Sequence, residues 1–281
     1  MILQLKIFIA KWTSGIVPYK CINDHWYRLP FGVSRAFAPW KKHILEPYEL
    51  DAIRKYGAKD GVYLDIGANV GLLTLAMREW AGTAARIYAV EPNPHAFELL
   101  GGVLRLNRMN PAGTWALAIS DYCGTTKFQV SQRDSLGVMS SLRRNDPLAS
   151  EVEVPCMTID ALCRQWDRLD YIKIDVEGAE ILVLTGAQAT LIRLRPVVQV
   201  EVHGPFLGAF GHSVGQLFDL MSGLGYVAIN AVTSEVTNAA AFNTDTALDA
   251  RHPLTRENMR YSGYGHVVFR PGADNPGGSD A

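Results

Sequence analysis

The stretch Val62-Tyr-Leu-Asp-Ile-Gly-Ala-Asn-Val-Gly71 decides the fold, because it joins a short apolar run to a turn of small residues. Val62 to Ile66 has the character of a parallel strand that is buried on both faces. Apolar residues at helical spacing predict a helix from Val70 to Trp80. Strand, turn and helix therefore predict the start of a βαβ unit.

The rest of the chain continues this alternation. Further strands are predicted at Ala85–Val90, Trp115–Ser120, Tyr171–Asp175, Val197–His203, Tyr226–Val232 and His266–Arg270, with helices at Glu46–Tyr56, Pro94–Asn107, Ala179–Leu194 (weak at Gly186) and Ser213–Leu224. Thr125–Val130 and Val152–Met157 predict a small hairpin-like β insertion. The pattern predicts an α/β fold, a doubly wound parallel sheet that binds ligands beyond the carboxyl ends of its strands.

Length and charge narrow the function classes. The 281 residues suit one large domain with added arms, and the net charge of −1 without a basic block argues against a nucleic-acid partner. The four cysteines form no C-x-x-C pair, so we expect reduced thiols in a cytoplasmic protein rather than a zinc ribbon or redox motif.

We expect three regions: an N-terminal arm over residues 1–45, a main domain over 46–270 and a disordered tail over 271–281. His25 to Pro30 predicts a short strand within the arm. The apolar start of the arm is too short for a transmembrane segment. It predicts a helix that packs on the domain or on a second subunit, with peripheral membrane contact as the alternative.

The turn after the first strand predicts a cofactor site. Gly67, Ala68, Asn69 and Gly71 let the backbone approach a ligand closely, and Glu91 ends the next strand, where a carboxylate can accept both hydroxyls of a ribose. Leucine replaces the last glycine of the dinucleotide fingerprint. Asp65, before the turn, would repel a pyrophosphate and suit a cationic amino and sulfonium end. The ligand is therefore predicted to be S-adenosylmethionine (SAM), with NAD as the alternative.

A second group of charged residues ends two later strands. Alternation places Lys173 and Asp175 on one face of their strand, and Glu201 and His203 on one face of theirs. If the strands are neighbours, we expect Lys173 to oppose Glu201 as a supporting ion pair, with Asp175 and His203 at the tips where chemistry occurs. With Glu177 these residues include ligand types for a divalent metal, but the spacing fixes no metal geometry and we expect none.

Several motifs in order resemble the FkbM family of SAM-dependent methyltransferases. They are Leu64-Asp-Ile-Gly-Ala-Asn-Val-Gly, Val90-Glu-Pro-Asn-Pro, Ala118-Ile-Ser, Met157-Thr-Ile-Asp-Ala-Leu, Ile172-Lys-Ile-Asp-Val-Glu-Gly-Ala-Glu and Val200-Glu-Val-His. The resemblance implies a class I methyltransferase fold, Rossmann-like, with seven strands of which the last is antiparallel. It also adds Pro92, Asn93 and Ser120 to the expected cofactor contacts.

The resemblance further implies O-methylation of a hydroxyl on a sugar, polysaccharide or natural product. We expect His203 as the base that takes the hydroxyl proton, Asp175 as a second catalytic residue, and Glu177 and Glu201 as substrate-binding residues. Two alternatives stay open at this point: an NAD-dependent oxidoreductase on a similar sheet, and a non-catalytic SAM-binding protein.

Overall fold

The computed structural model describes residues 19–22, 25–30, 33–34, 47–110, 113–131, 149–246 and 264–272. The predicted N-terminal contact helix and most of the predicted tail lie outside these residues. Pro271, which was predicted to begin the tail, instead ends the last strand. No helix in the described part of the chain is long and apolar enough to cross a membrane.

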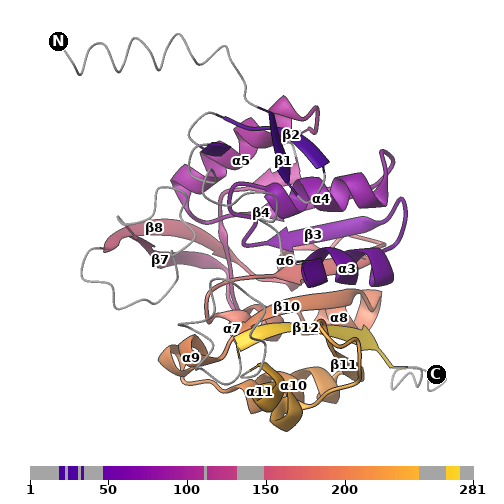
Figure 1. The fold of residues 1–281 in the computed structure, drawn as a ribbon. Coiled ribbons are helices and arrows are strands. Elements are labelled where there is room, and N and C mark those ends of the chain that lie inside the picture. The colour runs from indigo at the N-terminus through magenta and orange to yellow at the C-terminus, as the bar shows by residue number, and fades with distance from the viewer. Residues whose placement is uncertain are drawn as a thin grey trace.

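A seven-stranded sheet forms the centre of the molecule (Figure 1). Its spatial order is β11 (Tyr226–Asn230), β12 (Tyr264–Pro271), β10 (Val197–His203), β9 (Tyr171–Ile174), β3 (Val62–Ile66), β4 (Arg86–Val90) and β5 (Thr114–Trp115). The last strand of the chain, β12, is antiparallel to both its neighbours, and the other pairs are parallel. The predicted fold class is confirmed. The strand order reverses beside β3, and a ligand crevice is expected there.

Helices cover both faces of this sheet, because successive apolar residues of its strands point to opposite faces and both faces must be buried. Tyr63 faces one apolar core and Leu64 the other. The Tyr63 side packs on α3 (Pro47–Tyr56), α4 (Leu72–Ala81) and α5 (Pro94–Leu106). The Leu64 side packs on α6 (Ile159–Leu162), α7 (Glu180–Thr185), α8 (Gln188–Leu194), α9 (Gly204–Leu207), α10 (Val214–Gly223) and α11 (Ala239–Thr246). The α9 helix continues into a short 3-10 turn at Gly208–Phe210.

The single strand predicted at Trp115–Ser120 is wrong, because the segment divides between two sheets. Its start, β5, is the edge of the large sheet, while β6 (Ala118–Ile119) pairs with β8 (Ala149–Met157), which pairs with β7 (Gly124–Ser131). Ala118 joins a separate small core with Phe128, Val154 and Cys156, and this core explains the change of sheet. The predicted β insertion is thus present, and Figure 1 shows its hairpin extending away from the large sheet.

The long helix predicted at Ala179–Leu194 is broken at its predicted weak point. It forms α7 and α8, which meet around Gly186. A Cβ at Gly186 would lie 2.2 Å from the carbonyl oxygen of Ser120, so the break brings these two segments into close contact. In the predicted arm, β1 (Tyr19–Ile22) pairs with β2 (His25–Arg28) as a separate two-stranded sheet.

Candidate functional site

The turn after β3 is held by close backbone packing. Gly67 has a φ of +78°, and a Cβ there would lie 1.8 Å from the carbonyl oxygen of Asp175 at the end of β9. Gly71 has a φ of +85°, and its Cβ would meet Leu100 of α5. Asn69 also adopts a positive φ, a conformation that asparagine tolerates. The small residues therefore join the first strand to β9 and α5, in addition to any contact with a ligand.

Glu91 organises the next side of the site. Its Oε2 accepts the backbone N–H of Asn69 at 2.8 Å, and its Oε1 accepts the backbone N–H of Asn93 at 2.7 Å. Each carboxylate oxygen can accept more than one hydrogen bond, so these contacts leave capacity for ribose hydroxyls. Burial raises the pKa of Glu91 to about 7.

A cavity opens over the carboxyl ends of β3, β4 and β9. Its polar lining includes Glu91, Asp175 and Glu177, and an apolar part is formed by Leu117, Ile119 and Phe128. The remaining lining residues are Ile66, Gly67, Asn69, Val90, Pro92, Ala118 and Val176. The sequence predicted Gly67, Asn69, Glu91 and Pro92 at this place, whereas the insertion residue Phe128 was missed.

Other predicted cofactor residues lie nearby with structural contacts of their own. Asp65 is buried, accepts the Thr74 hydroxyl at 2.5 Å, and has a pKa raised by burial to about 6. Asn93 caps α5 by accepting the N–H groups of His95 and Ala96. The Ser120 hydroxyl donates to Asp121 at 3.1 Å. Ala68 is buried, and its N–H donates to Val90. The cavity lining includes none of these four residues, so their ligand contacts stay predictions.

The predicted acceptor residues converge at the tips of β9 and β10. His203 Nε2 lies 3.8 Å from Asp175 Oδ1, 3.9 Å from Glu177 Oε2 and 3.6 Å from Glu201 Oε1. On the other side of the ring, His203 Nδ1 lies 2.7 Å from Glu180 Oε1. Asp175 and Glu177 also line the cavity, so they join the cofactor half of the site to His203.

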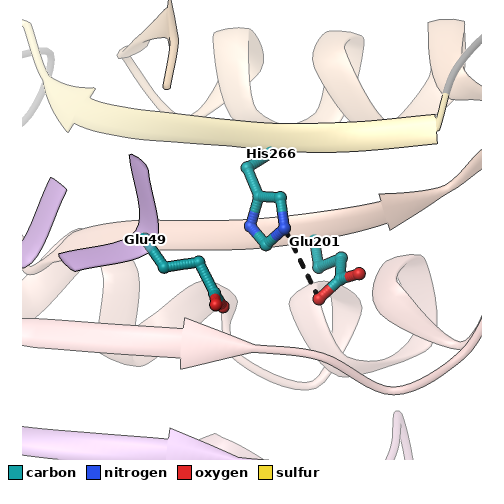
Figure 2. Close-up of side chains that lie close together, drawn as sticks. All are labelled: Glu49, Glu201 and His266. Atoms are coloured by element: carbon teal, nitrogen blue, oxygen red, sulfur yellow. Dashed lines mark ion pairs between the residues drawn. The ribbon is translucent and has the colours of Figure 1, made fainter. Parts of the chain in front are cut away.

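A buried ion cluster around Lys173 lies next to these ends of β9 and β10, on the side of the sheet interior. Lys173 Nζ lies 3.4 Å from Glu49 Oε1, 3.6 Å from Glu201 Oε2 and 3.7 Å from Asp175 Oδ2. The predicted pairing with Glu201 is confirmed, although the β10 residue directly opposite Lys173 in the register is Gln199. Figure 2 shows Glu49, Glu201 and His266 approaching one another from α3, β10 and β12.

The charged groups in this region shift one another's pKa values. Burial alone would lower the pKa of His203, but Glu177, Glu180 and Glu201 together raise it well above its usual value. Burial and Glu201 raise the pKa of Asp175. Burial lowers the pKa of His266 to about 3, so this ring is neutral at physiological pH. The site thus carries an excess of negative charge next to the cavity.

Within the described residues, two sets of side chains have ligand atoms within 4.8 Å of one another, as a metal site would require: Asp175, Glu177 and His203, and Glu49, Glu201 and His266. In the second set the Lys173 ammonium already provides a cation. That no metal takes part remains a prediction.

Sequence reasoning missed Glu49, Glu180 and His266. Glu49 and His266 reach the cluster from opposite ends of the chain, and local patterns cannot show such proximity. Glu180 does have a sequence signal, since it ends one of the motifs that resemble the FkbM family, Ile172-Lys-Ile-Asp-Val-Glu-Gly-Ala-Glu180.

Comparisons with known proteins agree with this architecture. Residues 65–228, more than half of the chain, match the family model of the methyltransferase FkbM domain. The hexuronic acid methyltransferase AglP of Haloferax volcanii is 27% identical over 213 residues, which cover 71% of this chain and 81% of the relative. The methyltransferase sdnD of Sordaria araneosa is 27% identical over 172 residues, covering 50% and 66% of the two chains.

Among solved structures, methyltransferase FkbM from Methylobacillus flagellatus has a TM-score of 0.45 and 14% identity. The match covers 80% of this chain but 48% of that one, so this chain spans about half of its length. The family model decides between the cofactors predicted from the turn, since NAD has no methyl group to transfer and SAM has one on its sulfonium sulfur. The chain belongs to the FkbM family of SAM-dependent methyltransferases.

Proposed function

We propose that the protein transfers a methyl group from SAM to a hydroxyl oxygen of a sugar or natural product. The observation that carries this proposal is a cavity lined on one side by the buried carboxylate of Glu91 and on another by Asp175 and Glu177. The latter two approach His203, which provides a nitrogen base.

The cofactor half suits SAM in three respects. Glu91 is fixed by two backbone N–H groups and retains acceptor capacity for a ribose. Leu117, Ile119 and Phe128 offer an apolar wall on which an adenine can pack. Asp175 and Glu177 place negative charge where a cationic sulfonium is favourable and a pyrophosphate is not. Bound there, SAM supplies an activated methyl group on its sulfonium sulfur.

The acceptor half must position a hydroxyl and remove its proton. Asp175 and Glu177 can accept a hydrogen bond from the acceptor and orient its oxygen toward the cavity. His203 Nε2 then takes the hydroxyl proton as the oxygen–methyl bond forms and the methyl–sulfur bond breaks, with its electron pair left on the sulfur of S-adenosylhomocysteine. A base placed in this way contributes about 10²- to 10⁴-fold to the rate. Because its carboxylate neighbours raise the pKa of His203, we expect turnover to increase as the pH rises toward the alkaline range.

The acidic surroundings also favour a hydroxyl over a carboxylate as the acceptor. A hexuronic acid, on which the relative from Haloferax volcanii acts, has both groups. Asp175, Glu177 and Glu201 would repel a substrate carboxylate at the point of transfer. A carboxylate also needs no base, so the arrangement around His203 would be unnecessary for ester formation.

Replacement of His203 tests the assignment. We expect His203→Ala to bind SAM with the wild-type Kd in calorimetry, while its turnover of hydroxylated acceptors falls by about 10²- to 10⁴-fold. His95→Ala, which removes an exposed imidazole from α5, is the matched control and should retain full turnover. A His203→Ala enzyme with wild-type turnover would exclude the base role. A protein that binds SAM but methylates no acceptor would support the non-catalytic alternative.

A further inference from the structure

Glu180 is a buried carboxylate directly behind His203. It is the first residue of α7 and is fully buried. Its Oε1 lies 2.7 Å from His203 Nδ1 and also accepts the backbone N–H of Gly178 at 3.0 Å. Its Oε2 has no hydrogen-bond partner among the described residues. Burying a carboxylate with so few partners is costly, and costs of this kind are expected at functional sites.

The contact with Glu180 determines which ring nitrogen of neutral His203 is free to accept a proton. A carboxylate accepts hydrogen bonds, so the neutral imidazole keeps its proton on Nδ1 and presents the Nε2 lone pair on the other side. Nε2 is the atom that faces Asp175, Glu177 and Glu201. Glu180 therefore selects the tautomer that can accept a proton at the acceptor side.

The ring is also held in orientation by its neighbours. Phe206 of α9 lies nearly parallel to the His203 ring, with centroids 6.0 Å apart and an interplanar angle of 12°. Gly178 has a φ of +105°, and a Cβ there would lie 2.7 Å from Phe206 Cβ. The turn at Gly178 thus brings both the Phe206 ring and the Glu180 carboxylate against the imidazole.

We propose that Glu180 is the positioning residue of methyl transfer, acting through His203; this inference rests on the proposed O-methyl transfer. The acceptor proton passes from the hydroxyl oxygen to His203 Nε2, the Nδ1 proton stays in place, and Glu180 remains a carboxylate that stabilises the imidazolium. The proton on Nε2 leaves to solvent after turnover. The positioning logic is that of the acid in a Ser–His–Asp triad, here without a nucleophile.

The positions of the charged groups around His203 allow a positioning role of Glu180 to be distinguished from a purely structural role. Glu177 and Asp175 follow β9, Glu201 lies on β10, and Glu180 comes from α7. Beyond Glu201 lie Lys173 and His266. Only Glu180 contacts Nδ1 among these groups, so its amide variant removes one negative charge while an oxygen can still accept the Nδ1 proton.

The pH profile of Glu180→Gln is the first test. We expect the rise of kcat with pH to shift toward lower pH, because His203 loses one stabilising charge, while the plateau stays within a few-fold of wild type. Glu180→Ala, which loses the acceptor for Nδ1, should lower the plateau kcat by about 10- to 10²-fold with the KM for SAM unchanged. Glu98→Gln makes the same charge change at an exposed site on α5 and should leave the pH profile of kcat unchanged.

A double-mutant cycle shows whether Glu180 acts through His203. In a His203→Ala background, Glu180→Gln should have no further effect on the pH profile. A structural role predicts the reverse: lower Tm and weaker SAM binding in Glu180→Gln with an unmoved pH profile. An unmoved profile, or a full plateau rate in Glu180→Ala, would overturn the proposal.

A spectroscopic readout keeps this inference separate from the proposed function. The ¹⁵N NMR shifts of the neutral His203 ring should report the Nδ1–H tautomer in wild type and loss of that preference in Glu180→Ala. A neutral ring protonated on Nε2 in wild type would overturn the inference even if methyl transfer is confirmed. The expected tautomer without any hydroxyl methylation would instead show that the proposed function has failed.

Discussion

Gly67→Ala should disrupt the junction between the two halves of the site. The added Cβ would lie 1.8 Å from the carbonyl oxygen of Asp175, and real Cβ contacts essentially never fall below 3.0 Å, so turn and strand must separate by at least about 1.2 Å. The obstacle is backbone and cannot rotate away. Because Asp175 N–H also donates to Ile66 next to the turn, the separation would strain that hydrogen bond.

The expected cost has two parts. An alanine at a φ of +78° costs about 1–2 kcal/mol, because its Cβ is disfavoured in the left-handed region. Forcing the backbone apart adds about 1–3 kcal/mol. Gly211→Ala is the matched control, since Gly211 has the same φ of +78° and no atom within 4 Å of its Cβ position. Gly211→Ala should therefore lose only the unfolding free energy that comes from alanine in the left-handed region.

Urea unfolding and SAM calorimetry on the two variants measure both effects. We expect Gly67→Ala to lose about 1–3 kcal/mol more unfolding free energy than Gly211→Ala. SAM binding should weaken at least tenfold in Gly67→Ala alone, since a displacement of about 1 Å at a site can cost up to 10²-fold. Equal stability and equal SAM affinity in the two variants would refute the reasoning.

Three further predictions concern buried charge. SAM affinity should fall as the pH drops below about 7, because protonated Glu91 can no longer accept hydrogen bonds from both ribose hydroxyls. Calorimetry should show a loss of up to tenfold in affinity per pH unit. An affinity that stays constant from pH 8 to 6 would contradict this prediction. Without SAM, the folded state holds a proton on Glu91 more tightly than the unfolded chain does. The unfolding free energy of the protein should therefore decrease by roughly 3 kcal/mol as the pH rises from 4.5 to about 7. The raised pKa of Asp65 changes the stability in the same direction. Thermal unfolding should therefore show a larger SAM-induced rise in Tm at pH 8 than at pH 5.5, and equal rises would count against it. Lys173→Met leaves Glu49, Glu201 and Asp175 without their shared cation and should cost about 3–5 kcal/mol in urea unfolding. The control Lys127→Met removes an exposed lysine from a surface ion pair and should leave the unfolding free energy nearly unchanged.

The large sheet could be predicted from the sequence because its signals are local. The apolar run at Val62–Ile66 and the turn after it define the first βα unit, and Gly186 was correctly expected to weaken its helix. The strand at Trp115–Ser120 was wrong because only pairing with a segment nearly forty residues later moves Ala118 into the second sheet. Apolar character alone does not say which sheet a strand joins.

The site was predictable only in part, for the same reason. Glu91, Asp175 and His203 could be placed because each lies at or directly after the carboxyl end of a strand whose direction follows from the fold. Glu49 and His266 reach the same cluster from a helix before the sheet and from the last strand, and only tertiary packing brings them together. Their long-range contacts determine the charge around Lys173.

The position of the transferred methyl group tests the central claim most directly. Purified protein would be incubated with SAM labelled with ¹³C in its methyl group and a panel of sugars, uronic acids and hydroxylated natural products. NMR of the products would then locate the label. The proposed site predicts a methyl ether on a hydroxyl oxygen, formed in wild type and lost in His203→Ala. A label found as a methyl ester, or on nitrogen or carbon, would contradict it.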